Sequence, residues 1–199
     1  MARLANVISP NGKDAAMSGT SHTDSGARAA LPSDCRTETL GVAFFDLSRI
    51  AEWSSSDEDA RVASFFQEFY ALAAKHIEAA GGRIVKLMGD AGLAVFPTES
   101  AEDVIFALCA FAREARGRGG EFGFDVYLNV NVHVGPVLAG SFGPPDGERF
   151  DVIGKTVNIA ARLGRRGVTL SPQAFRTLSP EARERFEKIK PPITYRFRP

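Results

Sequence analysis

Two long amphipathic segments alternate with short apolar ones along this chain, and that order sharply limits the folds available to it. The first, residues 54–82, begins with serines and acids and ends at Gly81-Gly82, so both ends of a helix are marked. The second, residues 100–120, begins with acids and ends with arginines and glycines, which predicts another helix. Apolar residues at helical spacing predict one buried face in the first segment: Val62, Phe65, Phe66, Phe69, Leu72, Ala73 and Ile77.

The apolar segments around these helices are typical of strands. Residues 40–47, LGVAFFDL, predict a buried strand. Residues 83–88 and 93–96 predict a hairpin around Gly89-Asp90, because glycine at the first turn position suits a type II′ turn. Residues 124–135 alternate strictly, so we expect a strand with one face exposed. Its predicted core face carries Val126, Leu128, Val130 and Val132, and its predicted exposed face carries Tyr127, Asn129, Asn131 and His133.

The predicted order is strand, helix, two strands, helix and strand, which is the ferredoxin-like split βαβ arrangement. We therefore predict an α+β fold with a ferredoxin-like βαββαβ core and αβ additions at its C-terminal end. Thr156 is the expected cap of a short added helix, and Gly164 or Gly167 is its expected end. The predicted additions are strands at 136–143, 149–154, 167–171 and 193–198, a short helix at 155–167 and a helix at 171–186.

Residues 1–38 differ from the rest of the chain, since they are rich in small and polar residues and have few large apolar ones. We predict that they form a disordered tail or linker and that residues 39–199 form one folded domain. The longest apolar run, Val104–Ala112, is too short to span a bilayer, and no secretory signal is visible. A cytoplasmic protein without membrane insertion is therefore expected.

Charge and metal-binding residue types argue against several functions. The 199 residues include 24 basic and 24 acidic side chains, so there is no positive surplus for binding nucleic acid. The two cysteines, Cys35 and Cys109, do not indicate a disulfide framework, and Cys109 falls in an apolar helical pattern typical of a buried thiol. The three histidines, His22, His76 and His133, are far apart, so a zinc site is not expected.

Two aspartates lie where predicted strands end or turn. Asp46 closes the first strand, and Asp90 lies in the hairpin turn. If these elements are neighbours in the sheet, the carboxylates converge at one sheet end and could hold two Mg²⁺ ions roughly 3.5–4 Å apart, as in phosphoryl or nucleotidyl transfer. Such Mg²⁺ sites often use only one or two carboxylates, with substrate phosphates as further ligands. Taken singly, each aspartate is also what turns and strand ends commonly carry for local hydrogen bonding.

Two further pairs have side chains suited to a nucleotide. Asn158 and Arg162 are four residues apart on the predicted short helix, where asparagine can fix a sugar and arginine can stabilise charge on a phosphate. Lys86 and Asp151 lie in short apolar strands, and a lysine donor beside a carboxylate acceptor matches the edge of adenine. The alternatives are an ordinary surface arginine with a helical asparagine, and an exposed salt bridge.

Together these residues resemble those of a known family. The segments VKLMGDAGLAVF, VHVGPVLAGSFG and FDVIGKTVNIAARL resemble the catalytic domain of class III adenylyl and guanylyl cyclases. The resemblance runs from about Leu40 to the C-terminus. It implies a role for six residues: metal binding for Asp46 and Asp90, adenine selection for Lys86 and Asp151, ribose orientation for Asn158, and transition-state stabilisation for Arg162.

The resemblance also implies a reaction and an assembly. The reaction is the conversion of ATP to 3′,5′-cyclic AMP and pyrophosphate, with two Mg²⁺ (or Mn²⁺) ions per site. In the family the site forms across a head-to-tail dimer, in which one subunit supplies the aspartates and the other supplies the remaining residues. This chain has both sets, so the resemblance implies a homodimer with two equivalent sites.

The loop after Asp46 departs from the family pattern. Where the family has a glycine, an aromatic residue and a threonine, this chain has Arg49, Ile50 and Ala51. Arg49 could obstruct a triphosphate or contact it, and Lys190, followed by prolines, only partly matches a phosphate-binding lysine of the family. The alternative function is therefore a cyclase-fold module that binds nucleotide or a regulatory partner with little turnover. A P-loop enzyme is not expected, since no GxxxxGK[ST] occurs.

Overall fold

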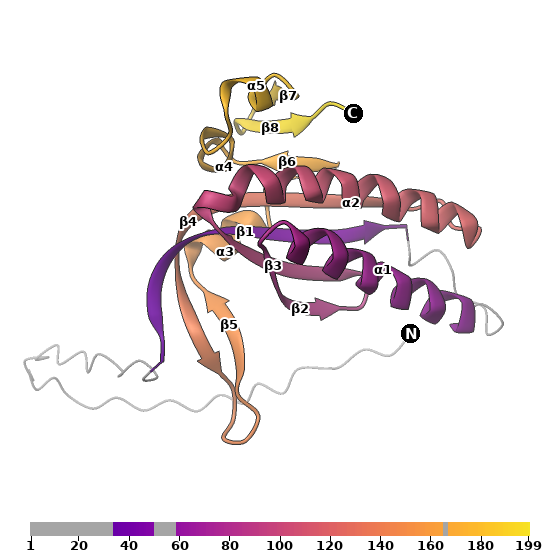
Figure 1. The fold of residues 1–199 in the computed structure, drawn as a ribbon, viewed down its shortest axis with the longest axis horizontal. Coiled ribbons are helices and arrows are strands. Elements are labelled where there is room, and N and C mark those ends of the chain that lie inside the picture. The colour runs from indigo at the N-terminus through magenta and orange to yellow at the C-terminus, as the bar shows by residue number, and fades with distance from the viewer. Residues whose placement is uncertain (1–33, 50–58, 165–166) are drawn as a thin grey trace, which may run out of the picture. The chain divides into compact units, whose positions relative to one another are not determined.

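The computed structural model describes residues 34–49, 59–164 and 167–199, which form a mixed sheet with helices on both faces (Figure 1). Most of the predicted tail, the serines before the first helix, and Ile50 and Ala51 lie outside these residues. The strands are β1 (Arg36–Ser48), β2 (Arg83–Met88), β3 (Ala91–Pro97), β4 (Tyr127–Phe142), β5 (Arg149–Ile153), β6 (Val168–Leu170), β7 (Phe186–Ile189) and β8 (Thr194–Phe197). The α-helices are α1 (Asp59–Ala79), α2 (Ala101–Glu121), α3 (Lys155–Ala160), α4 (Pro172–Arg176) and α5 (Pro180–Arg183).

The first six main elements confirm the predicted ferredoxin-like core. They follow one another as β1-α1-β2-β3-α2-β4, and their strands lie in the order β2-β3-β1-β4, with β1 antiparallel to both neighbours. Strands β6, β8 and β7 extend the sheet beyond β4, and β5 pairs with the second half of β4. Because β1 is central, Asp46 pairs with Ala91 of β3 on one side and with Asn129 of β4 on the other.

One face of the sheet is covered by α1 and α2 and holds the main core (Figure 1). The predicted apolar face of α1 is confirmed, since Phe65, Phe69 and Ile77 are fully buried. Phe45 of β1 meets the rings of Phe69 and Phe111 edge to face, at centroid distances of 6.1 and 5.6 Å. Each buried ring contributes about 1.5–3 kcal/mol to the free energy of unfolding. This packing holds the end of β1 against α1 and α2.

The opposite face carries a smaller apolar cluster, which α3 partly covers. Its buried members are Val42, Leu93, Val95, Val137, Ala139, Val152 and Ala160. The Thr156 hydroxyl donates to the Pro136 carbonyl at 2.7 Å, which ties α3 to β4. The expectation that Thr156 caps α3 is wrong. Gly154 holds the cap position, and Thr156 lies inside the helix. The helix also ends before Gly164, since its C-cap is Ala161.

Strand β4 differs from the prediction in length and in burial. It is one strand of 16 residues, Tyr127–Phe142, where two shorter strands were expected. Most of its polar face is also buried, since Asn129, Asn131 and His133 are only 4–5% exposed, whereas Tyr127 is 40% exposed, as predicted. The cause is tertiary: the Asn131 amide donates to the Gly164 carbonyl, and His133 hydrogen-bonds Ser171, so later parts of the chain cover this face.

The prediction of one helix at 171–186 is wrong, because the structure has two short helices there, α4 and α5. Pro180 has no N–H to donate, so a helix cannot run through it without losing a bond. Instead each short helix has its own serine cap: Ser171 accepts from the Ala174 N–H at 3.1 Å, and Ser179 accepts from the Ala182 N–H at 3.2 Å. The strand β7 was not predicted.

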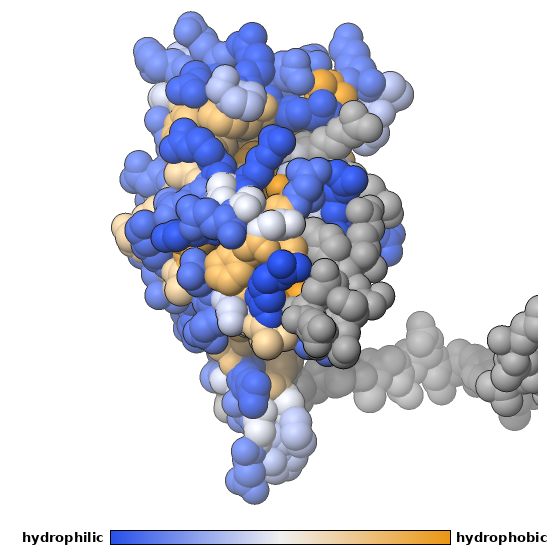
Figure 2. All heavy atoms as spheres, turned by 90° about the vertical axis from the view of Figure 1, so that its right-hand side faces the viewer, coloured by the Kyte–Doolittle hydropathy of each residue, from blue (hydrophilic) through white to orange (hydrophobic). Residues whose placement is uncertain are grey.

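Polar side chains cover much of the visible surface (Figure 2), and one of the two cysteines is buried. Figure 2 shows hydrophilic side chains over most of one end of the molecule, with apolar atoms visible between them. Cys109 is a buried free thiol, as predicted, and burial raises its pKa to about 12. None of the helices in the described ranges is both long enough and apolar enough to cross a membrane.

Candidate active site

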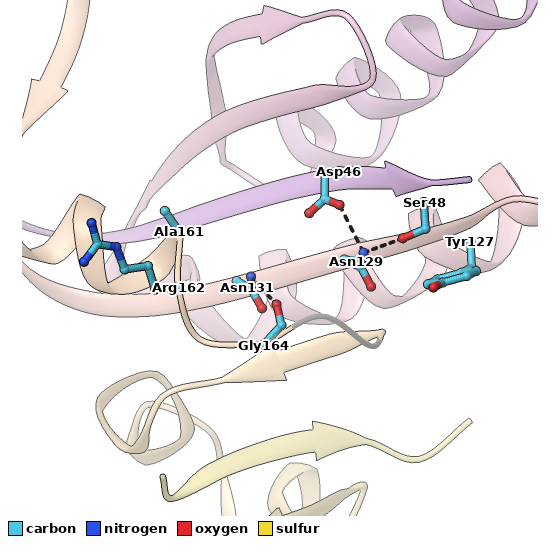
Figure 3. Close-up of a pocket in the computed structure, with 8 residues that line it drawn as sticks. All are labelled: Asp46, Ser48, Tyr127, Asn129, Asn131, Ala161, Arg162 and Gly164. Atoms are coloured by element: carbon cyan, nitrogen blue, oxygen red, sulfur yellow. Dashed lines mark hydrogen bonds between the residues drawn. The ribbon is translucent and has the colours of Figure 1, made fainter. Parts of the chain in front are cut away.

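The end of β1 that carries Asp46 opens into a cavity of about 550 Å³ (Figure 3). Phe45 and Leu47 belong to the helix-covered core, so strand alternation places Asp46 on the opposite face of the sheet. The lining comes from β1, β4 and the segment after α3: Asp46, Ser48, Tyr127, Asn129, Asn131, Ala161, Arg162 and Gly164.

Asn129 holds the Asp46 carboxylate in place. Its Nδ2 donates to Asp46 Oδ2 at 3.0 Å and to Ser48 Oγ at 2.7 Å (Figure 3). Asp46 and Asn129 are direct partners across β1 and β4, so the sheet register itself produces this contact. The opposite amide orientation would set a carbonyl oxygen against the carboxylate, so the donor assignment follows from the charges.

Asp90 lies in the turn between β2 and β3, as predicted, and its backbone reaches the same sheet end as Asp46. The Leu47 N–H donates to the Asp90 carbonyl at 2.8 Å. Gly89 has a φ of 64°, which the first position of a type II′ turn requires. Tyr70 of α1 donates its hydroxyl to the Gly89 carbonyl at 2.9 Å, so the helix supports the turn.

Lys86 and Asp151, which were predicted to read a base, are in direct contact. Lys86 Nζ donates to Asp151 Oδ2 at 2.5 Å, across a sequence separation of 65 residues. The pair lies in a second cavity of about 360 Å³ between β2 and β5. The β2–β3 register shifts between Ile84 and Lys86, a bulge of the kind that redirects side chains near functional sites. A lysine ammonium has three protons, so two remain beyond the one given to Asp151.

The prediction that Asn158 and Arg162 both lie on the short helix is wrong, because α3 ends at Ala160. Asn158 lies exposed on α3, whereas Arg162 lies in the turn that follows, where its N–H donates to the Ile159 carbonyl at 3.0 Å. Arg162 is exposed and lines the Asp46 cavity, while Asn158 lines neither of the two cavities. The structure therefore brings Arg162, but not Asn158, to the same cavity as Asp46 within one chain.

The two residues predicted to contact phosphate have different surroundings. Arg49 has a φ of 74°, so this position adopts the left-handed conformation that favours glycine. Its guanidinium forms an ion pair with Asp125. Lys190 lies exposed in the turn between β7 and β8 and lines neither cavity that holds the other predicted residues.

Three lining residues were missed as site residues by the sequence interpretation: Ser48, Asn129 and Asn131. The two asparagines were noticed only as the exposed face of an alternating strand. Each has an Oδ1 atom that accepts no hydrogen bond from the protein groups the structure describes. Polar residues on the strand that pairs with the Asp46 strand were the available signal, but the pairing itself could not be read from the sequence.

The oxygen atoms around Asp46 suit a hard divalent cation. Within the described ranges, no group of three or more His, Cys, Asp or Glu side chains is placed to hold a metal. The cavity nevertheless offers the Asp46 carboxylate, the Ser48 hydroxyl and the Asn129 amide oxygen, and Mg²⁺ accepts such oxygen donors together with substrate phosphates. The residues present therefore fit Mg²⁺ or Mn²⁺.

Comparison with known proteins identifies the family and the fold. An adenylate cyclase of Anabaena cylindrica is 27% identical over 135 residues, which are 64% of this chain and 27% of that protein. The chain thus spans about a quarter of the length of the curated relatives it matches. The crystal structure of the adenylyl cyclase CyaB from P. aeruginosa has a TM-score of 0.68 at 16% identity, covering 83% of this chain and 96% of that one. The guanylyl cyclase Cya2 has a TM-score of 0.64 at 16% identity, covering 81% and 92%.

These structural likenesses show the fold, and they include both adenylyl and guanylyl cyclases. The family model described as the adenylate and guanylate cyclase catalytic domain matches residues 33–190, which is most of the chain and includes both cavities. This chain therefore belongs to the adenylate and guanylate cyclase catalytic domain family.

Proposed function

We propose that this chain is an adenylyl cyclase that converts ATP to 3′,5′-cyclic AMP and pyrophosphate. The observation that carries the choice of ATP is the Lys86–Asp151 contact, in which a donor and an acceptor are 2.5 Å apart. Adenine presents a ring-nitrogen acceptor beside an exocyclic amine donor, and a lysine with a carboxylate complements that edge. Guanine presents a carbonyl oxygen and a protonated ring nitrogen there, which is the reverse pattern.

The remaining roles follow from the chemistry of the side chains. Asp46 and Asp90 would hold two Mg²⁺ or Mn²⁺ ions per site, which when bound supply charge neutralisation for the phosphates. Arg162, exposed at the Asp46 cavity, would stabilise negative charge that develops on the α-phosphate. Asn158, exposed on α3, would hydrogen-bond the ribose and orient its 3′-hydroxyl.

We also propose a head-to-tail homodimer. In one chain Asp46 lines the cavity at the end of β1, whereas Lys86 and Asp151 line the cavity between β2 and β5. A second copy in the opposite direction would bring the Lys86 cavity of one subunit to the Asp46 cavity of the other, and the two-fold axis would complete both sites. Arg162 lines the Asp46 cavity of its own chain. A test must therefore distinguish action of Arg162 in that site from action in the site that contains Asp46 of the other subunit.

Mixed inactive variants provide that test. In an Asp90→Ala and Arg162→Ala heterodimer, a shared site leaves one complete site, whereas a site built within one chain leaves none. We expect activity to return when the two variants are mixed under conditions in which heterodimers form. Heterodimers without activity would contradict the shared site and would assign Arg162 to the cavity of its own chain.

The alternative is a cyclase-fold module that binds nucleotide or a regulatory partner with little turnover. The observation in its favour is Arg49, which replaces the family glycine at a φ of 74° and is paired with Asp125. A side chain at this position, where glycine would leave the backbone open, would keep a triphosphate farther from the backbone N–H groups. Arg49→Gly would raise turnover if this residue limits it, and the same change would lower nucleotide affinity if Arg49 contacts phosphate.

The direct assay measures cyclic nucleotide formed from ATP or GTP with Mg²⁺ or Mn²⁺. We expect cyclic AMP from the purified chain, more of it from ATP than cyclic GMP from GTP, and none from Asp46→Ala. No product above the Asp46→Ala control, with nucleotide binding intact, would favour the binding module. A preference for GTP would overturn the roles of Lys86 and Asp151.

A further inference from the structure

Asn129 has an amide oxygen that plays no role in the contacts described so far. Its Nδ2 is engaged by Asp46 and Ser48, but its Oδ1 accepts no hydrogen bond from any protein group that the structure describes. The residue is 4% exposed and lines the Asp46 cavity. An unpaired acceptor at this depth is unfavourable, so it normally faces a ligand or an ordered water.

The position of this oxygen allows it to share an ion with Asp46. The nitrogen and oxygen of one amide are roughly 2 Å apart. Since Nδ2 lies 3.0 Å from Asp46 Oδ2, the amide oxygen lies within roughly 5 Å of that carboxylate oxygen. Two oxygens on opposite sides of one Mg²⁺ or Ca²⁺ ion are roughly 4–5 Å apart. The distance between the two oxygens therefore does not exceed the span that one bound cation bridges.

The charges at this end of the cavity favour a cation over an anion. Asp46 is acidic, and Asn129 has only its acceptor left, so a phosphate oxygen would meet repulsion and no donor. Among the described lining residues Arg162 is the cation, and Figure 3 shows it at the left of the view, beyond Asn131, while Asp46 lies nearer the middle. A hard cation bound by a carboxylate and an amide oxygen satisfies both groups.

We propose that Asn129 Oδ1 is a direct ligand of the divalent cation that Asp46 binds. One amide then performs two tasks: its nitrogen orients the carboxylate, and its oxygen completes the ion's coordination. The inference rests on the proposed function, because it concerns the cation site of the proposed cyclase. It adds a neutral ligand from β4 to the carboxylates of β1 and the β2–β3 turn.

Asn131 is the matched control. It lies two residues along on the same strand and face, is equally buried at 4%, and also has an unpaired Oδ1. Its Nδ2, however, donates to the Gly164 carbonyl at 2.9 Å, and its partner in β1 is Phe44. Residues two apart on a strand are roughly 7 Å apart, so Asn131 cannot share an ion with Asp46 as closely as Asn129 does.

Terbium provides a probe that needs no turnover. Tb³⁺ is a hard cation that oxygen ligands bind, and Tyr127 in the cavity lining can sensitise its emission. Titration of Tb³⁺ alone into the full chain gives the affinity. Emission lifetimes in H₂O and D₂O give the number of water molecules on the ion. We expect Asn129→Leu to weaken binding about tenfold and to add one water, because its oxygen is replaced by solvent.

Two other variants separate ligation from positioning. Asn129→Asp keeps an oxygen but removes the donor to Asp46, so we expect the wild-type number of waters and binding at least as tight as wild type. Asn131→Leu should leave both quantities unchanged. If Asn129→Leu binds more weakly but adds no water, then Asn129 only positions Asp46 and direct ligation is wrong. Equal Tb³⁺ affinity in wild type and Asn129→Leu would mean that the amide oxygen binds only water. That result would also overturn the inference.

The experiment can reject the Asn129 ligand without rejecting the metal site, and it can also reject both. If Asp46→Ala abolishes Tb³⁺ binding but Asn129→Leu does not change it, the cation site of the proposed function stands and the inference fails. If the wild-type chain shows no sensitised Tb³⁺ binding, with or without 3′-deoxy-ATP, which cannot cyclise, then both fail. Melting temperatures of all variants show whether each is folded.

Discussion

Replacing Lys86 with methionine separates the stability of this protein from its choice of base. The substitution keeps most of the side chain's length and removes its charge and its donors. In the Lys86–Asp151 pair the side chains are 41% and 28% exposed. Ion pairs at such exposure contribute about 0–1 kcal/mol to the free energy of unfolding, so Lys86→Met should lower the melting temperature by only a few degrees.

The expected effect on selectivity is larger. A hydrogen bond from a charged donor to a base contributes about 1.5–3 kcal/mol, which is roughly 10- to 150-fold in kcat/KM. Lys86 Nζ gives one proton to Asp151 and has two others with which to reach adenine. We therefore expect kcat/KM for ATP to fall roughly 10- to 150-fold, with a much smaller change for GTP.

The assay compares kcat/KM for ATP and GTP in wild type, Lys86→Met and Lys155→Met. Lys155 is the matched control, since it is an exposed lysine on α3 that lines neither cavity. If the ATP-to-GTP ratio is the same in Lys86→Met as in wild type, in a variant that melts normally, Lys86 does not read the base. A fall in melting temperature of more than about 10 °C would instead make the ion pair a structural one.

Three further predictions concern packing and pH. Gly92→Ala should lower the free energy of unfolding by about 1–3 kcal/mol, because a Cβ there would lie 2.2 Å from the buried Phe45 ring, and an unchanged urea midpoint would contradict this. Thr156→Val should cost about 1 kcal/mol in the same assay, since it removes the hydrogen bond that ties α3 to Pro136. Burial lowers the pKa of His133 below its usual 6.5, so the unfolded chain binds a proton that the native chain does not. Stability from this residue is therefore complete above pH 6.5 and is lost as the pH falls, and His133→Gln should flatten the acid decline in melting temperature; an unchanged decline would assign it elsewhere.

Local patterns were sufficient for the βαββαβ core because each of its elements carries its own signals. The second helix was expected at 100–120 and runs Ala101–Glu121, since acids mark its start, although Gly119 and Gly120 lie inside it and do not end it. The first hairpin strand was expected at 83–88 and is Arg83–Met88, because Gly89 sets the turn. These signals act over a few residues and need no knowledge of the rest of the fold.

Local patterns failed where the environment is supplied by distant parts of the chain. Alternation in β4 correctly grouped Asn129, Asn131 and His133 on one face, but it could not say what covers that face. Asn131 and His133 are covered by Gly164 and Ser171, which lie 33 and 38 residues later. The burial of these polar side chains was therefore invisible in the sequence.

The candidate site divides in the same way. Residue types and the motifs around them were enough to select Asp46, Lys86 and Asp151 as candidate site residues. Their contacts, by contrast, come from the folding of distant segments: Lys86 contacts Asp151 across 65 residues, and Asp46 contacts Asn129 across 83. The physical reason is that strand pairing is non-local. Hydrogen bonds between strands set the register, and the register determines which side chains become neighbours.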